Sequence, residues 1–241
     1  MISFKTRILS KAANAYIKCK KYNKFGEMPD GFTFTCHAGA MLTKANSLES
    51  VREAIEWGAQ IVEFDVSFRP SGTAVIIHNG NPTEKMGVLL EDALKIVADS
   101  ETCKINLDLK STANVAEVDR LVNKYNLSAR VFYTGVFADW VDAVKSSSDI
   151  PYYLNHSITK EEASDKNAAL AVVKKAKELG AFGINSNFRG ASKLFVDTMH
   201  ENGLLVSLWT ANNADDMVKC IELKPDNITT KKPNMLKALL K

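Results

Sequence analysis

The feature that most constrains the fold is a regular alternation of short apolar segments with amphipathic segments of helical length, which begins at Phe32. Strands that alternate with helices of about 10–15 residues are typical of βαβ units and a parallel sheet. Nine segments have the composition of buried strands: 32–37, 60–67, 74–78, 104–110, 130–135, 150–155, 181–185, 204–210 and 227–230.

Two of these segments are too close together for a parallel connection. Only residues 68–73 separate 60–67 from 74–78, whereas a parallel crossover needs about a dozen residues, so this pair is predicted to form an antiparallel hairpin. Eight strands then remain for the parallel set. Eight suits a closed (β/α)8 barrel of the TIM type. A doubly wound open sheet is the alternative, which the lack of a G-x-G-x-x-G sequence after the first strand disfavours.

The residues that can end helices support this division. Ser47 can cap a helix that ends at Gly58, and Ser192 can cap another that ends at Gly203. Gly180 follows a third amphipathic segment. A small polar residue before an apolar pattern and a glycine after it are the usual signals of a helix start and stop.

The N-terminal segment differs in charge from the rest of the chain. Residues 1–26 contain seven Lys/Arg and no acid, which leaves 24 of the 31 Lys/Arg against all 28 Asp/Glu, a net charge of −4. This mildly acidic remainder argues against a nucleic-acid partner. In residues 2–25 apolar positions recur with helical spacing, so the segment is either a helix packed on the body or one that makes weak peripheral contact with an anionic membrane. We expect a basic helical extension and connector over 1–31 and a barrel over 32–241.

The cysteines and the hydropathy favour a cytoplasmic protein, with or without peripheral membrane contact. Cys19, Cys36, Cys103 and Cys220 lie far apart and form no C-x-x-C pair, which argues against a disulfide framework or a zinc ribbon. No apolar run approaches the ~18 residues needed to cross a bilayer. No signal-peptide pattern is recognisable.

Polar side chains collect near the carboxyl ends of the predicted strands, where a barrel carries its chemistry. Glu63 and Asp65 stand at i and i+2, so they emerge on the same face of one strand, and Asp108 and Lys110 repeat that spacing on another. A single carboxylate at a strand end is usually a cap or an ion-pair partner, but several polar strand ends in one barrel favour a functional site. Other predicted strands end in His37, Asn155, Asn185, Trp209, Thr210 and Thr230.

The hairpin brings a histidine to these acids if its loop has four residues. A loop over residues 70–73 pairs Asp65 with His78, and directly paired residues project from one face with Cβ atoms roughly 4.5–5.5 Å apart. The prediction depends on the loop length, because a slip of one residue would turn His78 to the other face.

Three carboxylates without cysteine form a hard oxygen site, which suits one Mg²⁺ or Ca²⁺ rather than Zn²⁺. The cation would offset the mutual repulsion of the three acids. Lys110 alone would offset this repulsion to a smaller extent. His37 and His78 could then serve as general base and general acid, since an unperturbed imidazole titrates near ~6.5. The pattern predicts metal-assisted phosphoryl transfer, in which the cation and Lys110 bind a phosphate.

Seven segments that carry these residues follow one another in order between residues 33 and 233: CHAGA at 36–40, NSLE at 46–49, GAQIVEFDV at 58–66, GTAVIIH at 72–78, INLDLK at 105–110, GLLVSLWTAN at 203–212 and ITTKKP at 228–233. Together they resemble the glycerophosphodiester phosphodiesterase family. The resemblance implies a TIM-type barrel and cation-dependent hydrolysis of glycerophosphodiesters to glycerol 3-phosphate and an alcohol, a reaction of glycerol and lipid metabolism. It also implies an acid–base pair (His37, His78), metal ligands (Glu63, Asp65, Asp108), a phosphate contact (Lys110) and a pocket wall (Trp209).

The chain departs from the family pattern at the mouth of the barrel. Ala38 stands where the family usually has an arginine, and Asp108 where its third carboxylate is usually a glutamate. Only residues 79–87 follow the second histidine before the next helix, where typical members carry an insertion of several dozen residues. Arg189, in the loop after the strand that ends at Asn185, is the candidate to replace the missing arginine, and both residues are predicted to contact substrate.

Three functions are open at this point. A phosphodiesterase that acts on a small-molecule phosphodiester is favoured, because both histidines and all three acids are present. A phospholipase D-like enzyme, or a phospholipase C-like enzyme that forms a cyclic phosphate, is an alternative within the same chemistry. A non-catalytic barrel that binds a phosphate or lipid headgroup, held at a membrane by residues 2–25, is the third.

Overall fold

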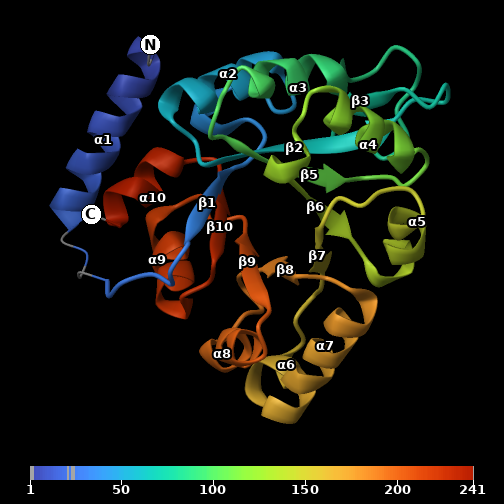
Figure 1. The fold of residues 1–241 in the computed structure, drawn as a ribbon. Coiled ribbons are helices and arrows are strands. Elements are labelled where there is room, and N and C mark those ends of the chain that lie inside the picture. Colours follow the sequence, from blue (N-terminus) through green and yellow to red (C-terminus); the bar gives the residue numbers. More distant parts are fainter. Residues whose placement is uncertain (1–2, 21, 23–24, 241) are drawn as a thin grey trace.

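The computed structural model describes residues 3–20, 22 and 25–240. Eight parallel strands form a closed ring, hydrogen-bonded in the order β1-β10-β9-β8-β7-β6-β5-β2, and the pairing of β1 with β2 closes it (Figure 1). The ring confirms the predicted TIM-type (β/α)8 barrel and excludes the open sheet. Its strands are β1 (Thr33–Cys36), β2 (Ile61–Phe68), β5 (Lys104–Leu109), β6 (Val131–Val136), β7 (Tyr152–Asn155), β8 (Gly183–Asn187), β9 (Leu205–Trp209) and β10 (Asn227–Thr230).

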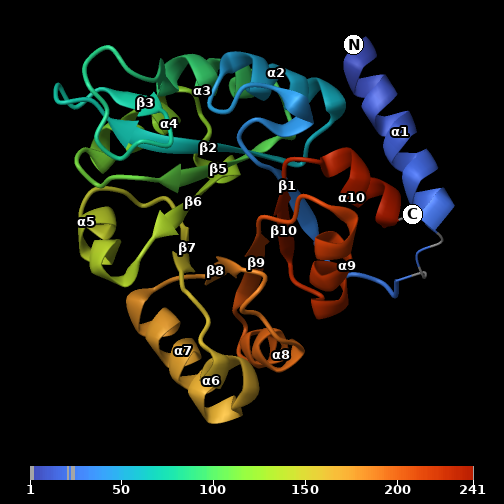
Figure 2. The same cartoon turned by 180° about the vertical axis from the view of Figure 1, so that it is seen from behind.

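Helices surround the ring (Figure 2). The predicted caps at Ser47 and Ser192 are present, since each hydroxyl accepts a backbone N–H of its helix, and Gly58 ends the first of these helices with a φ of 91°. The second helix ends two residues before Gly203, at Glu201. The helices are α2 (Leu48–Trp57), α3 (Leu90–Ala98), α4 (Val115–Lys124), α5 (Val141–Lys145), α6 (Lys160–Ser164), α7 (Lys166–Leu179), α8 (Lys193–Glu201), α9 (Ala214–Leu223) and α10 (Pro233–Leu239), with 3-10 turns η1 (Ala40–Leu42), η2 (Ser128–Arg130) and η3 (Ala138–Trp140).

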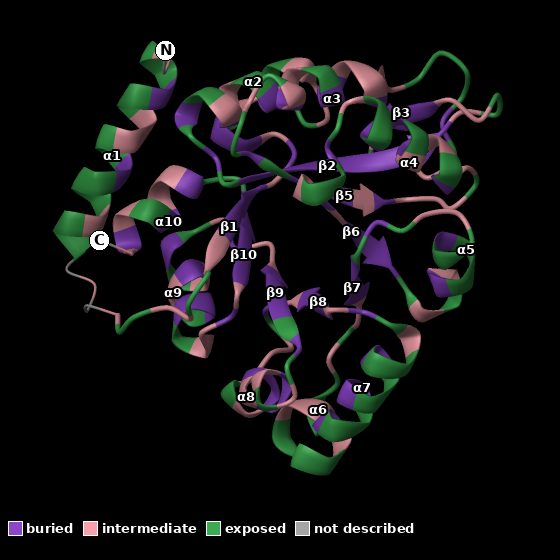
Figure 3. Cartoon of the chain, in the orientation of Figure 1, coloured by how far each residue is buried: buried purple, intermediate pink, exposed green. Residues whose placement is uncertain are grey.

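The core is an apolar layer between the ring and the helices (Figure 3). Side chains alternate along a strand, so β2 places Val62 and Phe64 in this layer and points Glu63 and Asp65 into the ring. Burial of each large apolar side chain contributes about 1.5–3 kcal/mol. The outer layer therefore stabilises a ring whose interior can carry charged groups.

The predicted hairpin is present, but its predicted register is wrong by one residue. β2 pairs with β3 (Ala74–Ile76) so that Val66 lies opposite Ile76, and the N–H of Ile77 donates to the carbonyl of Asp65 at 2.8 Å. Asp65 therefore lies opposite Ile77 rather than His78.

The physical reason for the shift is the length of the hairpin loop. The N–H of Arg69 donates to the carbonyl of Thr73 at 3.0 Å, which leaves three loop residues instead of four. Gly72 has a φ of 83° and supplies the left-handed residue that a three-residue hairpin loop requires. A short strand that the sequence did not predict, β4 (Val88–Leu89), pairs with the other edge of β3.

The N-terminal helix α1 (Phe4–Lys20) lies outside the ring against α10, as Figures 1 and 2 both show. Its Thr6 and Ala13 are buried, the Thr6 hydroxyl bonds to the carboxylate of Glu53 in α2, and the Leu9 carbonyl accepts from Asn234 Nδ2 at 2.8 Å. The helix is therefore packed on the body, as one interpretation predicted. The predicted segment 2–25 includes residues 2, 21, 23 and 24, which lie outside the described residues.

None of the helices in the described part of the chain is long and apolar enough to cross a membrane. The four cysteines are free thiols.

Candidate active site

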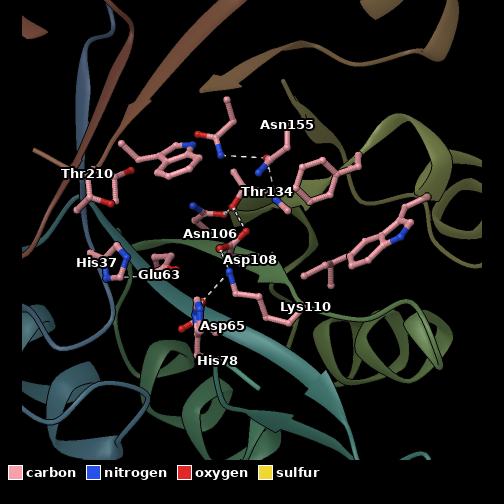
Figure 4. Close-up of a pocket in the computed structure, with 17 residues that line it drawn as sticks. His37, Glu63, Asp65, His78, Asn106, Asp108, Lys110, Thr134, Asn155 and Thr210 are labelled. Atoms are coloured by element: carbon pink, nitrogen blue, oxygen red, sulfur yellow. Dashed lines mark hydrogen bonds and ion pairs between the residues drawn. The ribbon is translucent and has the colours of Figure 1, made fainter. Parts of the chain in front are cut away.

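A cavity of about 340 Å³ opens at the carboxyl ends of the strands, and each strand of the ring, or the residue directly after it, contributes to the lining (Figure 4). Eight of the nine predicted site residues line it: His37, Glu63, Asp65, His78, Asp108, Lys110, Asn185 and Trp209. Two other polar residues predicted at strand ends, Asn155 and Thr210, line it as well, whereas Thr230 does not. The structure thus brings together all the predicted site residues except Arg189.

Three acids converge inside this cavity. One oxygen each from Glu63, Asp65 and Asp108 lies within 4.8 Å of the other two. The parallel register of β2 and β5 causes this convergence, because it places Asp65 beside Asp108 and Glu63 beside Asn106. Neighbouring parallel strands are about 4.8 Å apart, so paired residues on one face must lie close together.

Glu63 has the most unfavourable surroundings for a negative charge. Burial raises the pKa of its carboxyl well above the usual range, and the nearby charges of Asp65 and Asp108 raise this pKa further. The N–H of Ala38 donates to Glu63 Oε2 at 2.5 Å and opposes the shift only in part. Additional positive charge nearby would favour the ionised form of Glu63.

Asp65 has the opposite balance. Burial alone would raise the pKa of Asp65, but the Lys110 ammonium and a hydrogen bond from Asn46 outweigh it and hold the pKa below its usual value. Lys110 Nζ lies 3.0 Å from Asp65 Oδ1 and 2.5 Å from Asp108 Oδ2. Asn46 donates to Asp65 Oδ2 at 2.7 Å, and its own Oδ1 accepts the Asp65 N–H at 3.0 Å. Asp65 is therefore ionised at neutral pH and fixed in place.

The donor set fits a hard divalent cation. Its three members are carboxylate oxygens, with no thiolate among them, and such oxygen ligands suit Mg²⁺ and Ca²⁺. Lys110 supplies one positive charge against three acids, so the cluster lacks enough positive charge when all three are ionised. Glu63, Asp65 and Asp108 are thus the residues that could hold such an ion.

Each of the two histidines lies beside one of the acids, His37 beside Glu63 and His78 beside Asp65 (Figure 4). His37 is 25% exposed; its Nδ1 lies 3.0 Å from the carbonyl oxygen of Ala38 and 3.7 Å from Glu63 Oε2. Burial lowers the pKa of His37 below its usual value, so the imidazole is neutral at pH 7.

His78 is 80% exposed, and its Nδ1 lies 3.2 Å from Asp65 Oδ1. His78 reaches Asp65 despite the shifted register, because β3 ends at Ile76 and strand alternation no longer fixes its direction.

Neutral groups line the opposite side of the cavity. Asn185 Nδ2 donates to Asn155 Oδ1 at 3.0 Å, and the same oxygen accepts the N–H of Gly135 at 2.9 Å. The indole N–H of Trp209 is buried and has no hydrogen-bond partner among the described residues. A buried donor without a partner is costly. Trp209 therefore has an unused hydrogen-bond donor in a residue that lines the cavity.

Arg189 is not brought into the cavity. Its side chain is 68% exposed, and its guanidinium lies 3.6 Å from Asp216 Oδ2 in α9 and over the ring of Phe188 at 4.7 Å. The acid and the aromatic ring hold the guanidinium on the surface. In this structure Arg189 does not take the place of an arginine at Ala38.

Sequence reasoning missed several residues that shape the site. The Thr134 hydroxyl lies 3.0 Å from Asp108 Oδ1 and 2.8 Å from Asn106 Oδ1. Thr134 could have been predicted from the sequence, because it is a polar residue late in a buried strand, as the predicted site residues are. Phe137 and Trp140 form an edge-to-face pair on the cavity wall, with centroids 5.8 Å apart. They follow β6, outside any periodic pattern, so no sequence signal pointed to them.

Comparison with known families gives one match. The model of the Glycerophosphoryl diester phosphodiesterase family matches residues 80–235, well over half of the chain. The matched part contains Asp108, Lys110 and Trp209, whereas the acids of β2 and both cavity histidines precede it. No curated protein matches the chain.

Solved structures share the fold. A protein from Galdieria sulphuraria matches with a TM-score of 0.74 and 21% identity over 89% of this chain and 99% of that one. A phosphodiesterase from Oleispira antarctica was solved in complex with the product sn-glycerol-3-phosphate. It matches with a TM-score of 0.72 and 16% identity, and the match covers 88% of this chain and 97% of that one. A glycerophosphodiester phosphodiesterase from Parabacteroides distasonis matches with a TM-score of 0.65 and 18% identity, and the match covers 89% of this chain and 98% of that one. At these identities the likeness shows the barrel fold.

Proposed function

The chain belongs to the glycerophosphoryl diester phosphodiesterase family, and from this premise we propose that it hydrolyses glycerophosphodiesters to glycerol 3-phosphate and an alcohol. The observation that carries the proposal is the convergence of three acids, one lysine and two histidines in a single cavity at the carboxyl ends of the strands. Carboxyl ends of strands are where barrels of this type place their chemistry.

The acids and the lysine would bind the phosphate. Glu63, Asp65 and Asp108 would hold one divalent cation, Mg²⁺ or Ca²⁺, which when bound supplies positive charge to the phosphoryl oxygens. Lys110 already lies between two of these acids, so a small movement of its flexible side chain would bring its ammonium to a phosphate oxygen. Asn46 keeps Asp65 oriented while Lys110 moves.

The histidines would transfer the protons. His37, neutral at pH 7 because burial lowers its pKa, would accept the proton of the attacking water as the new P–O bond forms. His78 would donate a proton to the alcohol oxygen as its bond to phosphorus breaks. The exposure of His78 lets it exchange protons with solvent and return to its protonated form. Trp209 and Asn185 would contact the neutral part of the substrate.

The test is a product assay on the full chain. Glycerophosphocholine and glycerophosphoethanolamine are incubated with Mg²⁺ or Ca²⁺, with and without a chelator, and the products are identified by phosphorus NMR. Glycerol 3-phosphate formed only without chelator supports the proposal. A cyclic phosphate would instead support the phospholipase-like alternative, and binding without turnover would support a non-catalytic barrel.

A matched pair of variants on one strand links the activity to the site. Lys110→Met removes the phosphate-binding ammonium, whereas Lys104→Met changes an exposed residue at the far end of β5. We expect only Lys110→Met to lower turnover. Equal activity of the two variants would contradict the proposed role of Lys110.

We also propose that the protein is cytoplasmic and makes weak peripheral contact with an anionic membrane. The membrane contact is supported by α1, on which Arg7, Lys11 and Lys18 are exposed. Each such cation near an anionic membrane contributes about 1 kcal/mol. Binding of the full chain to anionic and neutral vesicles, compared by co-sedimentation, tests this contact.

A further inference from the structure

The helix α1 carries two apolar stripes, and only one of them packs on the body. The inner stripe is buried or packed against the core: Leu9, Ala13 and Ile17. The outer stripe has the same helical spacing but is exposed: Phe4, Ile8, Ala12, Ala15 and Cys19. A surface helix of a globular protein usually has one apolar stripe, with polar residues on the opposite face. α1 therefore presents apolar surface that packing on the body does not use.

A large apolar side chain of a second element joins the outer stripe. Phe4 is 79% exposed, and Ile8 is exposed one turn further along α1. Leu42 in η1 is 69% exposed, and its carbonyl accepts a hydrogen bond from Lys5 Nζ at 3.1 Å, which places η1 beside the first turn of α1. Tyr16 of α1 is exposed and lines a cavity of about 430 Å³ together with Leu42. We call Phe4, Ile8, Tyr16 and Leu42 the α1 face.

The α1 face holds half of the large apolar side chains that are exposed in the described part of the chain. The other half lie on separate elements: Met86, Phe137, Leu170 and Leu205. Single exposed apolar side chains are normal on a protein surface, whereas a group of them bordered by polar residues marks a surface that binds a protein or a membrane. The α1 face is such a group.

The backbone of η1 keeps Leu42 at the surface. Met41 and Leu42 have φ values of 59° and 61°, in the left-handed region that large side chains rarely adopt. The Met41 side chain is buried, and its N–H donates to the carbonyl of Lys231 at 3.1 Å, which fixes the turn. Backbone of this kind costs free energy and persists where the surrounding structure demands it, often at functional sites. The exposure of Leu42 is therefore built into the fold.

Basic side chains border the α1 face on two sides. Arg7, Lys11 and Lys18 are exposed in a row on α1 at i, i+4 and i+11, and Lys231 and Lys232 line the cavity beside the face. None of these five forms an ion pair with another described residue, and residues 1–26 contain no acid. An exposed apolar stripe bordered by Lys and Arg is the pattern of a helix that lies in the interface of an anionic membrane.

We propose that the α1 face docks on an anionic membrane by burying Phe4, Ile8 and Leu42 at the boundary between the lipid headgroups and the acyl chains. This inference rests on the membrane contact proposed above, and it adds the apolar side chains that enter the bilayer to a contact that so far depended on charge. It does not depend on the proposed reaction. Because η1 follows β1 at the end of the barrel where the active-site cavity opens, docking would also hold that opening near the lipid surface.

The test is co-sedimentation of the full chain with vesicles of phosphatidylcholine alone and of phosphatidylcholine mixed with phosphatidylglycerol. We expect binding to the mixed vesicles, weakened about tenfold in Phe4→Ser and in Leu42→Ser, because each variant removes one large apolar side chain from the bilayer. The comparison is repeated at about 1 M salt, where charges are screened beyond about 3 Å. Apolar insertion is not screened, so the remaining binding should still be weaker in the two variants than in the wild type.

Leu170→Ser is the matched control, because Leu170 is an exposed leucine on α7, across the ring from α1 (Figures 1 and 2). We expect it to bind like the wild type, and circular dichroism checks that all three variants fold. Equal binding of Phe4→Ser, Leu42→Ser and wild type would overturn the inference and leave a contact by charge alone. No binding to any vesicle would overturn both. Sedimentation velocity without lipid gives the other readout: a dimer that Phe4→Ser dissociates would assign the α1 face to a second copy of the chain and overturn the inference.

Discussion

The two sides of the active-site cavity differ in charge. On the side of β1, β2 and β5, acids, a lysine and a histidine contact one another, whereas on the side of β7, β8 and β9 the cavity is lined by amides and an indole (Figure 4). The charged groups of the first side contact one another, whereas on the second side the Trp209 indole N–H has no hydrogen-bond partner in the part of the chain that the structure describes. The difference supports the proposal that phosphate is bound on the first side and neutral groups of the substrate on the second.

The largest expected effect tests the charged side. His37→Ala should lower kcat by about 10²–10⁴-fold, because a positioned general base contributes that much. His156→Ala is the control, since His156 is paired with Glu162 at 2.9 Å and does not line the cavity. Steady-state kinetics on glycerophosphocholine measures both. Near-normal turnover in His37→Ala would remove this residue from the mechanism.

The next effect concerns the cation. Asp65→Asn should weaken Mg²⁺ or Ca²⁺ binding by about 100-fold, because even groups that only orient metal ligands contribute about 10–100-fold. Asp99→Asn, on the exposed end of α3, should leave binding unchanged. Isothermal titration with each cation gives the affinities. Equal affinities in the two variants would show that the acids of β2 do not hold the ion.

A smaller effect tests the neutral side. Trp209→Phe keeps the apolar contact and removes the N–H, so we expect KM to rise about threefold to tenfold with little change in kcat, the worth of one neutral hydrogen bond. Trp57→Phe serves as the control, because the Trp57 indole bonds Ser10 Oγ at 3.4 Å, away from the cavity. A large fall in kcat for Trp209→Phe would break the division between the two sides.

The smallest effect concerns the amino ends of the strands, away from the cavity, where His200 Nε2 of α8 lies 2.8 Å from Oδ2 of Asp226, the residue before β10. This hydrogen bond raises the pKa of His200, so the protonated form stabilises the fold. The contribution is complete below the unfolded pKa near ~6.5 and is lost as pH rises through the higher folded value. Urea unfolding should show His200→Gln to be less stable than wild type by about 0.5–1 kcal/mol at pH 5.5 and by less at pH 8.5. A pH-independent difference would contradict this.

The sequence predicted those parts of the site that depend on strand periodicity. Glu63 and Asp65 share a face because they are two residues apart, and the convergence with Asp108 followed from adjacent parallel strands. The hairpin register was not predictable to one residue, because the choice between three and four loop residues depends on the left-handed conformation of Gly72. The position of Arg189 depends on Asp216, an acid that is distant in sequence. The place where α1 packs on α10 depends on contacts between residues distant in sequence, such as that of Asn234 with Leu9, which local patterns do not reveal.

The position of His78 has a consequence for how such proteins diversify. Five of the six charged or titratable groups of the site stand on or next to strands of a ring that closes on itself, but His78 follows β3, a strand outside the ring. Segments inserted or deleted after His78 leave the eight-strand closure intact. The loop over residues 79–87 can therefore change in length without disturbing the ring, and such a change would alter the approach to His78, the proposed proton donor.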